Sequence, residues 1–432
     1  MKKGRRKKIL AVLSILTSVA LIGAGCQIGA PQKQVAPTVN LTYWSVFNES
    51  SQMQAVIAAY KAVAPNVVIT YKKLEIAEYQ QQLLDALAQN RGPDIFSVHS
   101  SWMPQFTNKL EPIQTSQAGL DKFVPVVKDV VNINNKTYGL PYSVDTLALY
   151  YNPKVLNSAG IAGPPATWDE FDAAVKKLTK MDAAKNITNQ AAAIGTVKNV
   201  NRGIDPLELL MLQNGTQMTN ATNTEATFAH SQLQSDNQPY SPGLAAFNKF
   251  LSYSRQTSAY YTWNGGFSSA FDEFSKSHLA MLFNYNYNYD KIVNLNNAAG
   301  IRVAQVPQIT GTQSPVSLAS FWVEGVSQKS QQKNEAWKFI LFATGKDGAK
   351  VYAQQTHKPG ARMDVLATQA GDRTLAPFVT QAPIAKTWYQ KNVSSIEAAL
   401  SDMVNVVLTG ARTTDQALKQ GETAIRVIMQ QD

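Results

Sequence analysis

YGLPYSVDTLALYYN, residues 138–152, is the stretch that decides how this chain folds. It is rich in β-branched and aromatic side chains and follows a turn-prone segment, a pattern typical of a β-strand. Pro141 has no backbone N–H donor, so its position cannot lie in the middle of a sheet. Polar Ser143 and Asp145 interrupt the apolar run directly after it. We interpret the stretch as a strand that crosses between two folded bodies; one ordinary buried strand with a solvated start is the alternative.

The start of the chain has the pattern of a bacterial lipoprotein signal. Basic residues between Lys2 and Lys8 precede an apolar run of about fourteen residues, which is too short to span a bilayer comfortably. Three small residues then precede Cys26, the only cysteine. The segment resembles a signal in which residues 1–25 are removed and Cys26 is lipidated, which implies an anchor on the extracytoplasmic face of the cell membrane. A plain secretory signal with a chance cysteine is the alternative.

The charge balance gives little support to nucleic-acid binding. The full sequence has 40 Lys and Arg against 30 Asp and Glu, a formal net charge of +10. Six of the basic residues precede Cys26, so the mature chain has 34 against 30 and a net charge of +4. We therefore expect no nucleic-acid partner. Residues 26–38 are mostly polar or small and contain two prolines, so we expect a flexible tether there.

The rest of the chain, about 400 residues, exceeds one ordinary core and predicts two domains. Alternating and β-branched segments predict strands at residues 39–44, 67–71 and 94–98, with amphipathic helices between them. This β-α-β-α-β order predicts an α/β fold with a largely parallel sheet covered by helices. Such sheets bind ligands at the carboxyl ends of their strands, which here are residues 44–48 and 99–102.

Five sequence motifs, taken in order, carry a family resemblance. They are Tyr43-Trp44 before a helix with Tyr60, Gly92-Pro93-Asp94-Ile95, residues 138–152 followed by Pro165-Ala166-Thr167-Trp168-Asp169-Glu170-Phe171, Leu279-Ala280-Met281 before an aromatic stretch, and Glu335-Ala336-Trp337-Lys338-Phe339-Ile340 leading to Pro359-Gly360-Ala361-Arg362. Each motif alone is weak, but the series covers nearly the whole mature chain. Together they resemble the extracellular solute-binding proteins of ABC importers, specifically the family related to maltose-binding protein.

The resemblance implies the type II fold of periplasmic binding proteins. In this fold two α/β lobes are joined by a hinge and hold the ligand in the cleft between them. The expected limits are residues 39–141 and 304–345 for lobe 1, and residues 142–303 and 346–432 for lobe 2. The chain is then expected to cross between the lobes at Pro141–Asp145, near Val303–Val306 and after Gly345.

Sugar recognition needs aromatic faces, which cover the apolar faces of pyranose rings, and planar polar groups, which exchange hydrogen bonds with hydroxyls. The sequence has both types at positions where the cleft is expected. The expected aromatic contacts are Trp44, Trp102, Tyr142, Trp263, Tyr285, Tyr287 and Trp322. The expected polar contacts are Asn48, Asp94, Asp145, Asn284, Glu324 and Arg362, with Arg202 and Asn286 as further candidates.

Two of these expectations rest on the resemblance, which implies that a carboxylate at Asp145 contacts sugar and that the ring of Tyr287 stacks on it. Others have structural alternatives. Trp44 could belong to the core, Asp94 could simply cap its Gly-Pro turn, and Arg362 could brace the hinge.

These features predict a substrate-binding lipoprotein, not an enzyme, that captures a sugar or oligosaccharide and delivers it to the transmembrane subunits of an ABC permease. We expect a monomer without cofactor or metal. The four histidines are scattered without metal-ligand spacing, and no glycine-rich phosphate loop follows a strand. The alternatives are a secreted carbohydrate-active enzyme with an aromatic groove, and a binding protein for a non-sugar solute such as a peptide or a polyamine.

Overall fold

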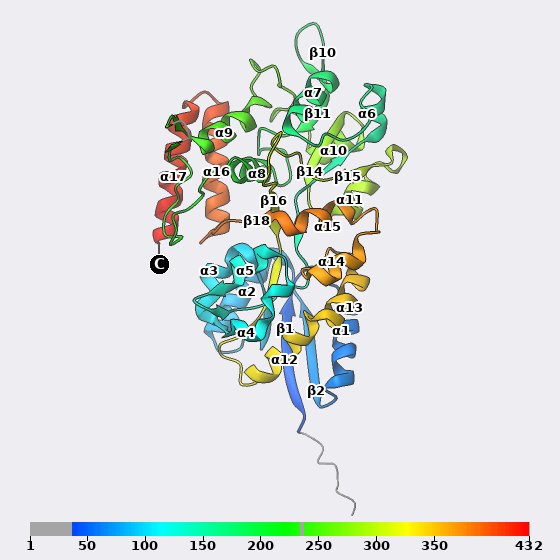
Figure 1. Ribbon diagram of the computed structural model, residues 1–432, viewed down its shortest axis with the longest axis vertical. Helices are drawn as coiled ribbons and strands as arrows, with labels where there is room; N and C mark the ends of the chain where they lie inside the picture. The colour runs from blue at the N-terminus through cyan, green and yellow to red at the C-terminus, as the bar shows by residue number, and fades with distance from the viewer. Residues whose placement is uncertain (1–36, 234–236, 432) are drawn as a thin grey trace, which may run out of the picture. The chain divides into compact units, whose positions relative to one another are not determined.

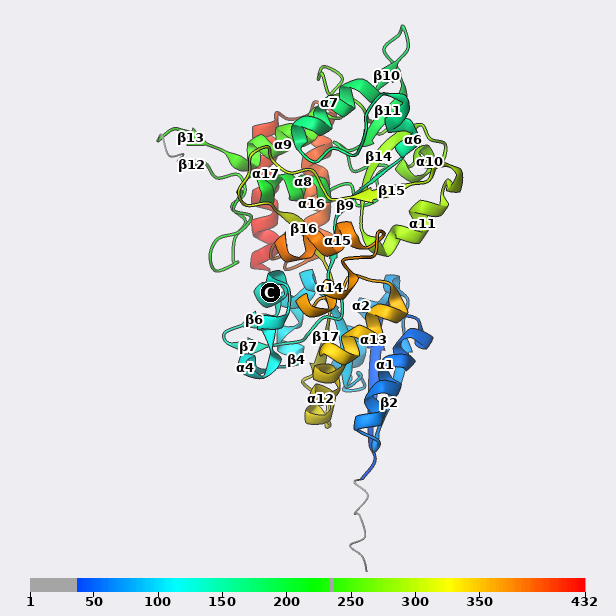
Figure 2. The same ribbon diagram turned by 45° about the vertical axis from the view of Figure 1, so that its right-hand side comes forward.

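The computed structural model describes residues 37–233 and 237–431, and Figures 1 and 2 show their arrangement. The expected signal sequence, Cys26 and nearly all of the expected tether lie outside the described residues. No helix within these two ranges is long and apolar enough to cross a membrane. The described chain forms two α/β lobes, each built around its own sheet and core.

The first lobe contains a five-stranded sheet in the order β2-β1-β3-β17-β4. β1 is parallel to β2 and β3, and β17 lies antiparallel to β3. Helices α1 and α2 connect the parallel strands, which confirms the β-α-β-α-β order predicted from the sequence. These elements are β1 (Val39–Ser45), α1 (Ser50–Val63), β2 (Val67–Lys73), α2 (Ile76–Ala88), β3 (Ile95–His99), β4 (Leu110–Glu111) and β17 (Trp322–Ser327).

Shorter elements and three later helices complete the first lobe. The apolar residues of α2, Tyr79, Leu83 and Leu87, recur one turn apart and are buried in the first core, as helical spacing dictates. The remaining elements are η1 (Ser100–Trp102), α3 (Met103–Phe106), η2 (Thr107–Lys109), β5 (Ile113–Gln114), α4 (Thr115–Ala118), η3 (Leu120–Lys122), α5 (Pro125–Val131), β6 (Asn132–Ile133), β7 (Lys136–Thr137), α12 (Lys333–Ala343), α13 (Lys346–Thr356) and α14 (Met363–Gln369).

The second lobe contains a mixed sheet in the order β10-β11-β14-β9-β15. β9 runs antiparallel to β14 and β15, whereas β11 is parallel to β14. The elements of this lobe are β9 (Ala148–Tyr151), α6 (Pro153–Ser158), α7 (Trp168–Leu178), β10 (Lys180–Met181), β11 (Ile187–Ala193), α8 (Asp205–Gln213), β12 (Gln232–Leu233), β13 (Pro239–Tyr240), α9 (Pro242–Ser252), α10 (Ala270–Ser275), β14 (Leu279–Asn284), η4 (Asn286–Asn288), α11 (Tyr289–Asn294), η5 (Asn297–Ala299), β15 (Arg302–Ala304), α16 (Val393–Leu408) and α17 (Thr414–Gln430).

A third, small sheet in the order β18-β16-β8 lies where the chain passes from one core to the other. β8 (Asp145–Thr146) is antiparallel to β16 (Ser317–Ser320), and β18 (Ala385–Lys386), which follows α15 (Ala376–Gln381) and η6 (Ala382–Ile384), is parallel to β16. Within β16 the buried residues change from the second core, at Leu318, to the first core, at Ala319. Both ribbon views place β16 between the two main sheets (Figures 1 and 2), and Figure 1 places β18 there too.

Two of the expected crossings lie elsewhere in the structure. β15 pairs with β9 in the second sheet, so the chain does not return to the first lobe near Val303–Val306 but later, in β16. α13 packs against α1 and α12, with Tyr352 in the first core, so the chain stays in the first lobe beyond Gly345 and crosses at β18. The lobe limits expected at residues 304 and 346 are therefore corrected. Apolar periodicity shows that a segment is buried, but not which sheet it joins.

Gly139 allows the chain to pass close to β17 just before the first crossing strand. Leu140 exchanges two backbone hydrogen bonds with Glu324, and a Cβ on Gly139 would lie 2.7 Å from the carbonyl oxygen of Glu324 and 2.5 Å from a methyl carbon of Val323. We expect Gly139→Ala to lower the free energy of unfolding by about 2 kcal/mol, because the added methyl group forces this contact apart. Urea unfolding measures the loss.

Gly163→Ala is the matched control, because a Cβ at Gly163 meets no atom within 4 Å. It should change the free energy of unfolding by less than about 0.5 kcal/mol. Equal effects of the two substitutions would contradict the role given to the close approach at Gly139.

Candidate functional site

A cavity of about 410 Å³ lies where the crossing strands meet the two lobes. The first lobe contributes the carboxyl ends of β1 and β3 and the start of β17, including residues 46–48 and 99–102. The second lobe contributes the start of α8, the loop after β14 and the segment 387–397. This volume, and a lining drawn from two lobes, are typical of a small-molecule site.

Trp322, at the start of β17, is the centre of an aromatic cluster in the first-lobe wall. The ring centroid of Trp322 lies 5.1 Å from that of Trp102, 5.2 Å from that of His99 and 5.7 Å from that of Phe47, all in edge-to-face contacts. Phe47 is 51% exposed and has a φ of +61°, which bulky side chains rarely adopt. Backbone strain of this kind clusters at ligand sites. The cluster therefore offers apolar ring surfaces to a ligand.

A second aromatic pair belongs to the second lobe. Tyr285 and Tyr287 follow β14, and their rings stack with centroids 5.6 Å apart and an interplanar angle of 12°. Tyr285 is buried, whereas Tyr287 is 52% exposed. The segment after Tyr285 forms the 3-10 turn η4 rather than an extended strand, and Tyr289 is not a lining residue.

Asp145 attaches this tyrosine pair to the crossing strand β8. Its carboxylate accepts hydrogen bonds from the backbone N–H groups of Asn286 and Tyr287, both at 3.0 Å, and of Thr146 at 2.8 Å. Burial raises the pKa of Asp145 to about 7, and the three N–H groups limit this rise because they stabilise the charged form. Asp145 lines the cavity as predicted, and it also fixes the loop that carries Tyr285.

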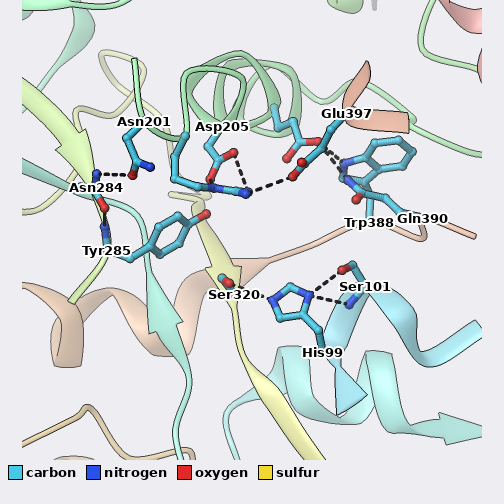
Figure 3. Close-up of polar contacts among 12 residues, drawn as sticks. His99, Ser101, Asn201, Asp205, Asn284, Tyr285, Ser320, Trp388, Gln390 and Glu397 are labelled. Carbon is cyan, nitrogen blue, oxygen red and sulfur yellow. Dashed lines mark hydrogen bonds and ion pairs between the residues drawn. The ribbon is translucent and has the colours of Figure 1, made fainter. Parts of the chain in front are cut away.

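The second-lobe end of the cavity contains an ionic cluster at the start of α8 (Figure 3). Arg202 donates to both carboxylate oxygens of Asp205, at 2.9 and 2.8 Å, and to Glu397 at 3.0 Å. The neighbouring Asp205 carboxylate raises the pKa of the Arg202 guanidinium, which therefore stays charged. Arg202 has a φ of +58°, a second strained backbone position at the cavity. A guanidinium has five N–H donors, so two of them remain for a ligand.

Glu208 lies one turn further along α8 and is almost fully buried. One of its carboxylate oxygens accepts hydrogen bonds from Nε1 of Trp388 and from Nε2 of Gln390, both at 3.0 Å (Figure 3). Burial, together with the nearby carboxylate of Asp205, raises the pKa of Glu208 to about 8. Trp388 and Gln390 follow β18, so these bonds attach α8 to the third crossing.

Glu324 and Asn48 form a polar part of the first-lobe wall. Glu324 is buried in β17, accepts a hydrogen bond from Oγ of Ser97 at 2.6 Å, and has its pKa raised by burial to about 7. The side-chain oxygen of Asn48 accepts hydrogen bonds from the hydroxyl of Tyr352 at 2.8 Å and from Nζ of Lys358 at 2.9 Å. These contacts hold a carboxylate and an amide in place on the cavity surface.

His99, at the end of β3, is a neutral ring in the cavity wall. Burial, assisted by the charge of Arg202, lowers the pKa of His99 to about 3. Its ring nitrogens lie 2.5 Å from Oγ of Ser101 and 3.0 Å from Oγ of Ser320 (Figure 3). Since Ser320 belongs to β16, this contact connects the first sheet to the second crossing.

Eight of the thirteen residues predicted for ligand contact line the cavity, as does the further candidate Arg202. The eight residues are Asn48, Trp102, Tyr142, Asp145, Tyr285, Tyr287, Trp322 and Glu324. Asn286 is buried beside them in η4 but is not a lining residue.

Two predicted tryptophans lie outside the cavity lining. Trp263 is fully buried, and its Nε1 donates to Oδ1 of Asn199 at 2.9 Å. Trp44 packs against the first core, with Nζ of Lys72 5.0 Å from its ring centroid. The prediction was wrong for both because an aromatic residue at a strand end or in a loop suits a core as well as a site.

Asp94 and Arg362 also lie outside the lining, and each of these charged groups is bonded to other side chains of the protein. The Asp94 carboxylate accepts hydrogen bonds from Thr42 and Ser330, which brace the Gly-Pro turn. Arg362 donates to both oxygens of Asp364. Asp94 therefore connects β1 to the segment before α12, and Arg362 is paired within its own segment.

Asn284 is the fifth predicted residue outside the lining. It is buried at the end of β14, donates to Oδ1 of Asn201 at 3.1 Å and accepts a hydrogen bond from the backbone N–H of Tyr285 at 2.9 Å (Figure 3). Asn284 therefore supports the segment that carries Tyr285 from outside the cavity.

Several lining residues were missed from the sequence. Phe47 and His99 lie within the strand ends that the parallel order indicated, but they were not selected. Glu208 carried a signal, because it is a carboxylate within the apolar helix DPLELLMLQ and a buried carboxylate needs a partner. Gln390 and Glu397 carried none, because only folding brings their segment to the cavity.

Two α/β lobes joined by crossing strands around a ligand-sized cavity define the type II class of periplasmic-binding-protein-like folds. The sequence profile of the bacterial extracellular solute-binding proteins matches residues 44–350. The chain belongs to this family of extracellular solute-binding proteins.

Individual relatives are distant. A maltotriose-binding protein from Pyrococcus abyssi is 28% identical over 134 residues, and this match spans 30% of the present chain but only 28% of that protein's length. A putative binding protein from Brucella abortus is 22% identical over 400 residues, which cover 86% of this chain and 88% of that one. The structure of the sugar-binding protein MalE from Xanthomonas citri has a TM-score of 0.75 at 17% identity, covering 90% and 97% of the two chains, and shows a shared fold.

The buried carboxyl groups predict that the protein loses stability as the pH rises. Burial raises the pKa of Asp145 and Glu324 to about 7 and that of Glu208 to about 8, whereas carboxyl groups of an unfolded chain titrate near about 4. Between these values the folded protein keeps protons that the unfolded chain has released. The stability that these protonated carboxyl groups give the folded protein is therefore fully present at the acid end. It is lost as the pH rises through the folded pKa values. Urea titrations should give a lower free energy of unfolding at about pH 8.5 than at about pH 5.5.

Glu324→Gln removes one of these groups and should reduce the fall between these two pH values by about 2 kcal/mol. Glu335→Gln is the matched control, because Glu335 lies on α12 and is paired with Lys338 at the surface. The control should leave the fall unchanged. Stability that increases across this pH range in the wild-type protein would contradict the prediction.

Proposed function

We propose that this protein binds a sugar or oligosaccharide in the interlobe cavity and delivers it to the transmembrane subunits of an ABC importer. The observation that carries the proposal is the presence of aromatic rings and planar polar side chains around one cavity. Trp322 and Phe47 supply rings from the first lobe, and Tyr285 and Tyr287 supply rings from the second. Pyranose rings combine apolar C–H faces with hydroxyl groups, so they need both kinds of contact.

The polar contacts in this proposal also come from both lobes. On the first-lobe side, Glu324 accepts hydrogen bonds from hydroxyls, and the side-chain N–H groups of Asn48 donate to them, because the oxygen of Asn48 already accepts two bonds. Arg202 donates to hydroxyls on the second-lobe side. The full set of proposed contacts is Asn48, Trp102, Tyr142, Asp145, Arg202, Tyr285, Tyr287, Trp322 and Glu324. A ligand held by both lobes favours their closed arrangement, and we place the hinge in the sheet β18-β16-β8.

The family and the names of its members support this choice of solute. The family consists of extracellular solute-binding proteins. The relative from Pyrococcus abyssi is named for maltotriose, and the structure from Xanthomonas citri is described as sugar-binding. These names describe those proteins. For this chain, the support for a sugar ligand is the aromatic and polar lining of its cavity.

Binding without turnover fits the state of the cavity carboxylates better than hydrolysis does. A glycosidase needs two carboxyl groups available on either side of the scissile bond. Asp145 is occupied by three backbone N–H groups and Glu397 by Arg202. Within residues 37–233 and 237–431, no group of three potential metal ligands occurs that could supply a metal-activated water.

The N-terminal signal supports a lipid anchor on Cys26. An anchored monomer would keep the binding lobes beside the membrane that contains the permease. The polar segment after Cys26 has the composition of a tether, which would give the lobes the reach that delivery requires.

Trp322→Ala and Tyr287→Ala should each weaken binding of a neutral oligosaccharide by about tenfold to a hundredfold. Loss of a ring packed on a sugar costs on the order of 1 to 3 kcal/mol. A thermal-shift screen that includes maltotriose identifies a ligand, and calorimetry then measures the affinities.

Trp44→Ala is the control for these two variants, because Trp44 is a partly buried tryptophan outside the cavity lining. It should bind like the wild-type protein. The proposal fails if no saccharide binds, and the proposed aromatic contacts fail if Trp322→Ala and Tyr287→Ala both retain full affinity.

Cys26→Ser should abolish lipidation and release the protein from the membrane, because a serine hydroxyl cannot form the thioether that holds the lipid. Detergent partitioning and mass spectrometry of the mature N-terminus measure the effect. Wild-type protein that stays in the aqueous phase with an unmodified Cys26 would exclude the anchor.

A further inference from the structure

Gln381, the last residue of α15, is a fully buried glutamine that hydrogen-bonds to the segments of all three crossings. Its Nε2 donates to Oγ1 of Thr146 at 3.2 Å and to the backbone carbonyl of Leu147 at 3.1 Å, in the first crossing. Its Oε1 accepts from the backbone N–H of Val306 at 2.7 Å, and its backbone carbonyl accepts from Oγ of Ser317 at 2.9 Å, on the way into the second crossing. Gln381 itself belongs to the third crossing, just before β18.

An amide side chain suits this position because the groups around it are of opposite kinds. The carbonyl of Leu147 needs a donor, whereas the N–H of Val306 needs an acceptor. A glutamine offers two N–H donors and one oxygen, so one neutral side chain satisfies both without burying a charge.

The partners of Gln381 lie at the second-lobe ends of the crossings. Leu147 and Val306 belong to the second core, as does Leu318, which follows Ser317. Phe378, one turn before Gln381, is also directed to the second lobe, with its ring 6.4 Å from that of Tyr150 in β9. Hydrogen bonds and packing therefore fix α15 to the second lobe.

The contact of α15 and the residues around it with the first lobe is of a different kind. Leu375, Val379, Ala382 and Ala385 belong to the first core, so apolar side chains make this contact. Both ribbon views place α15 between the two main sheets (Figures 1 and 2). Apolar contacts are not directional, so they tolerate a shift of packed elements better than hydrogen bonds of fixed geometry do.

We infer that Gln381 is a positioning residue for ligand binding, which holds the three crossings together as one unit with the second lobe. The two lobes then move relative to each other on the first-lobe side of α15, where the contact is apolar. The inference rests on the proposed binding function and names the residue that keeps the cavity assembled while the lobes move.

Gln381 acts on the cavity through the residues that the crossings carry. The lining includes Asp145 in β8, Ser320 in β16 and Thr387 directly after β18, but not Gln381 itself. Losing the bonds of Gln381 therefore removes no ligand contact. It lets the three crossings shift independently, so the ligand must pay the entropy of ordering them.

Gln381→Met keeps the length of the side chain and removes its amide group. We expect it to weaken binding by at least about tenfold in calorimetry with maltotriose, or with the saccharide that the thermal-shift screen identifies. Ser317→Ala removes only the bond to the backbone carbonyl of Gln381 and should weaken binding by about threefold. This milder variant tests the inference even if Gln381→Met does not fold.

A distance measurement between the lobes tests the same inference without any ligand. Spin labels on Lys61→Cys in α1 and Asp402→Cys in α16, both exposed positions, report the interlobe distance in Cys26→Ser protein. Both Gln381→Met and Ser317→Ala should broaden the distance distribution of the folded, ligand-free protein. A side chain that only stabilised the fold would leave this distribution unchanged.

Thr262→Val is the matched control. Thr262 is fully buried, and its Oγ1 accepts hydrogen bonds from the backbone N–H of Ala191 and from Oγ1 of Thr179, both at 2.8 Å and both within the second lobe. The control should unfold at a lower urea concentration than the wild-type protein, but with the wild-type affinity and distance distribution.

The outcomes separate this inference from the proposed function. The role of Gln381 is overturned if folded Gln381→Met and Ser317→Ala both keep the wild-type distance distribution, or if Thr262→Val broadens it equally. It is also overturned if both variants keep the wild-type affinity. If no saccharide binds, the proposed function is excluded, and the ligand-free distances still decide whether Gln381 holds the crossings together.

Discussion

The cavity depends above all on the carboxylate of Asp145 in the first crossing strand. It accepts backbone N–H groups from Thr146 in β8 and from Asn286 and Tyr287 in the loop after β14. One side chain therefore joins the strand that leaves the first lobe to the loop that carries the cavity's stacked tyrosines. Three N–H donors offset much of the cost of burying a charge, and the carboxylate satisfies donors that would otherwise be unpaired at the start of η4.

Each of the other two crossings has a comparable connection to a cavity residue. His99 reaches Ser320 in β16, and Glu208 binds Trp388 and Gln390 just after β18. Three polar groups that line the cavity, those of Asp145, His99 and Glu208, therefore also hold the crossing segments. A ligand that contacts them acts directly on the segments between the lobes, so binding and lobe arrangement are physically coupled.

The aromatic part of the lining has a different origin, because packing rather than hydrogen bonding positions it. Trp322 is surrounded edge-on by Trp102, His99 and Phe47, and Tyr285 stacks on Tyr287. Rings held in this way lose little further freedom when a ligand binds. The strained backbone of Phe47 and Arg202 is consistent with positions set for binding rather than for stability.

Much of the architecture could be read from local sequence, because the relevant signals act over a few residues. The spacing of apolar residues predicted the strands and helices of the first lobe, and their parallel order predicted that β1 and β3 end at the site. The resemblance to a known family supplied Tyr287 and Asp145. It did not supply the second and third crossing points, because a short buried strand such as β15 can pair with either sheet until its neighbours are known.

Local sequence was thus sufficient for the α/β class, the parallel sheet and the chemical character of the lining, since periodicity and composition report directly on secondary structure and burial. Three-dimensional folding alone decided that Trp263 is in a core and that Arg202 meets Glu397, 195 residues away, while Glu208 meets Trp388, 180 residues away. Such contacts depend on how two sheets and three crossings are placed in space. No pattern within a single helix or strand records that placement.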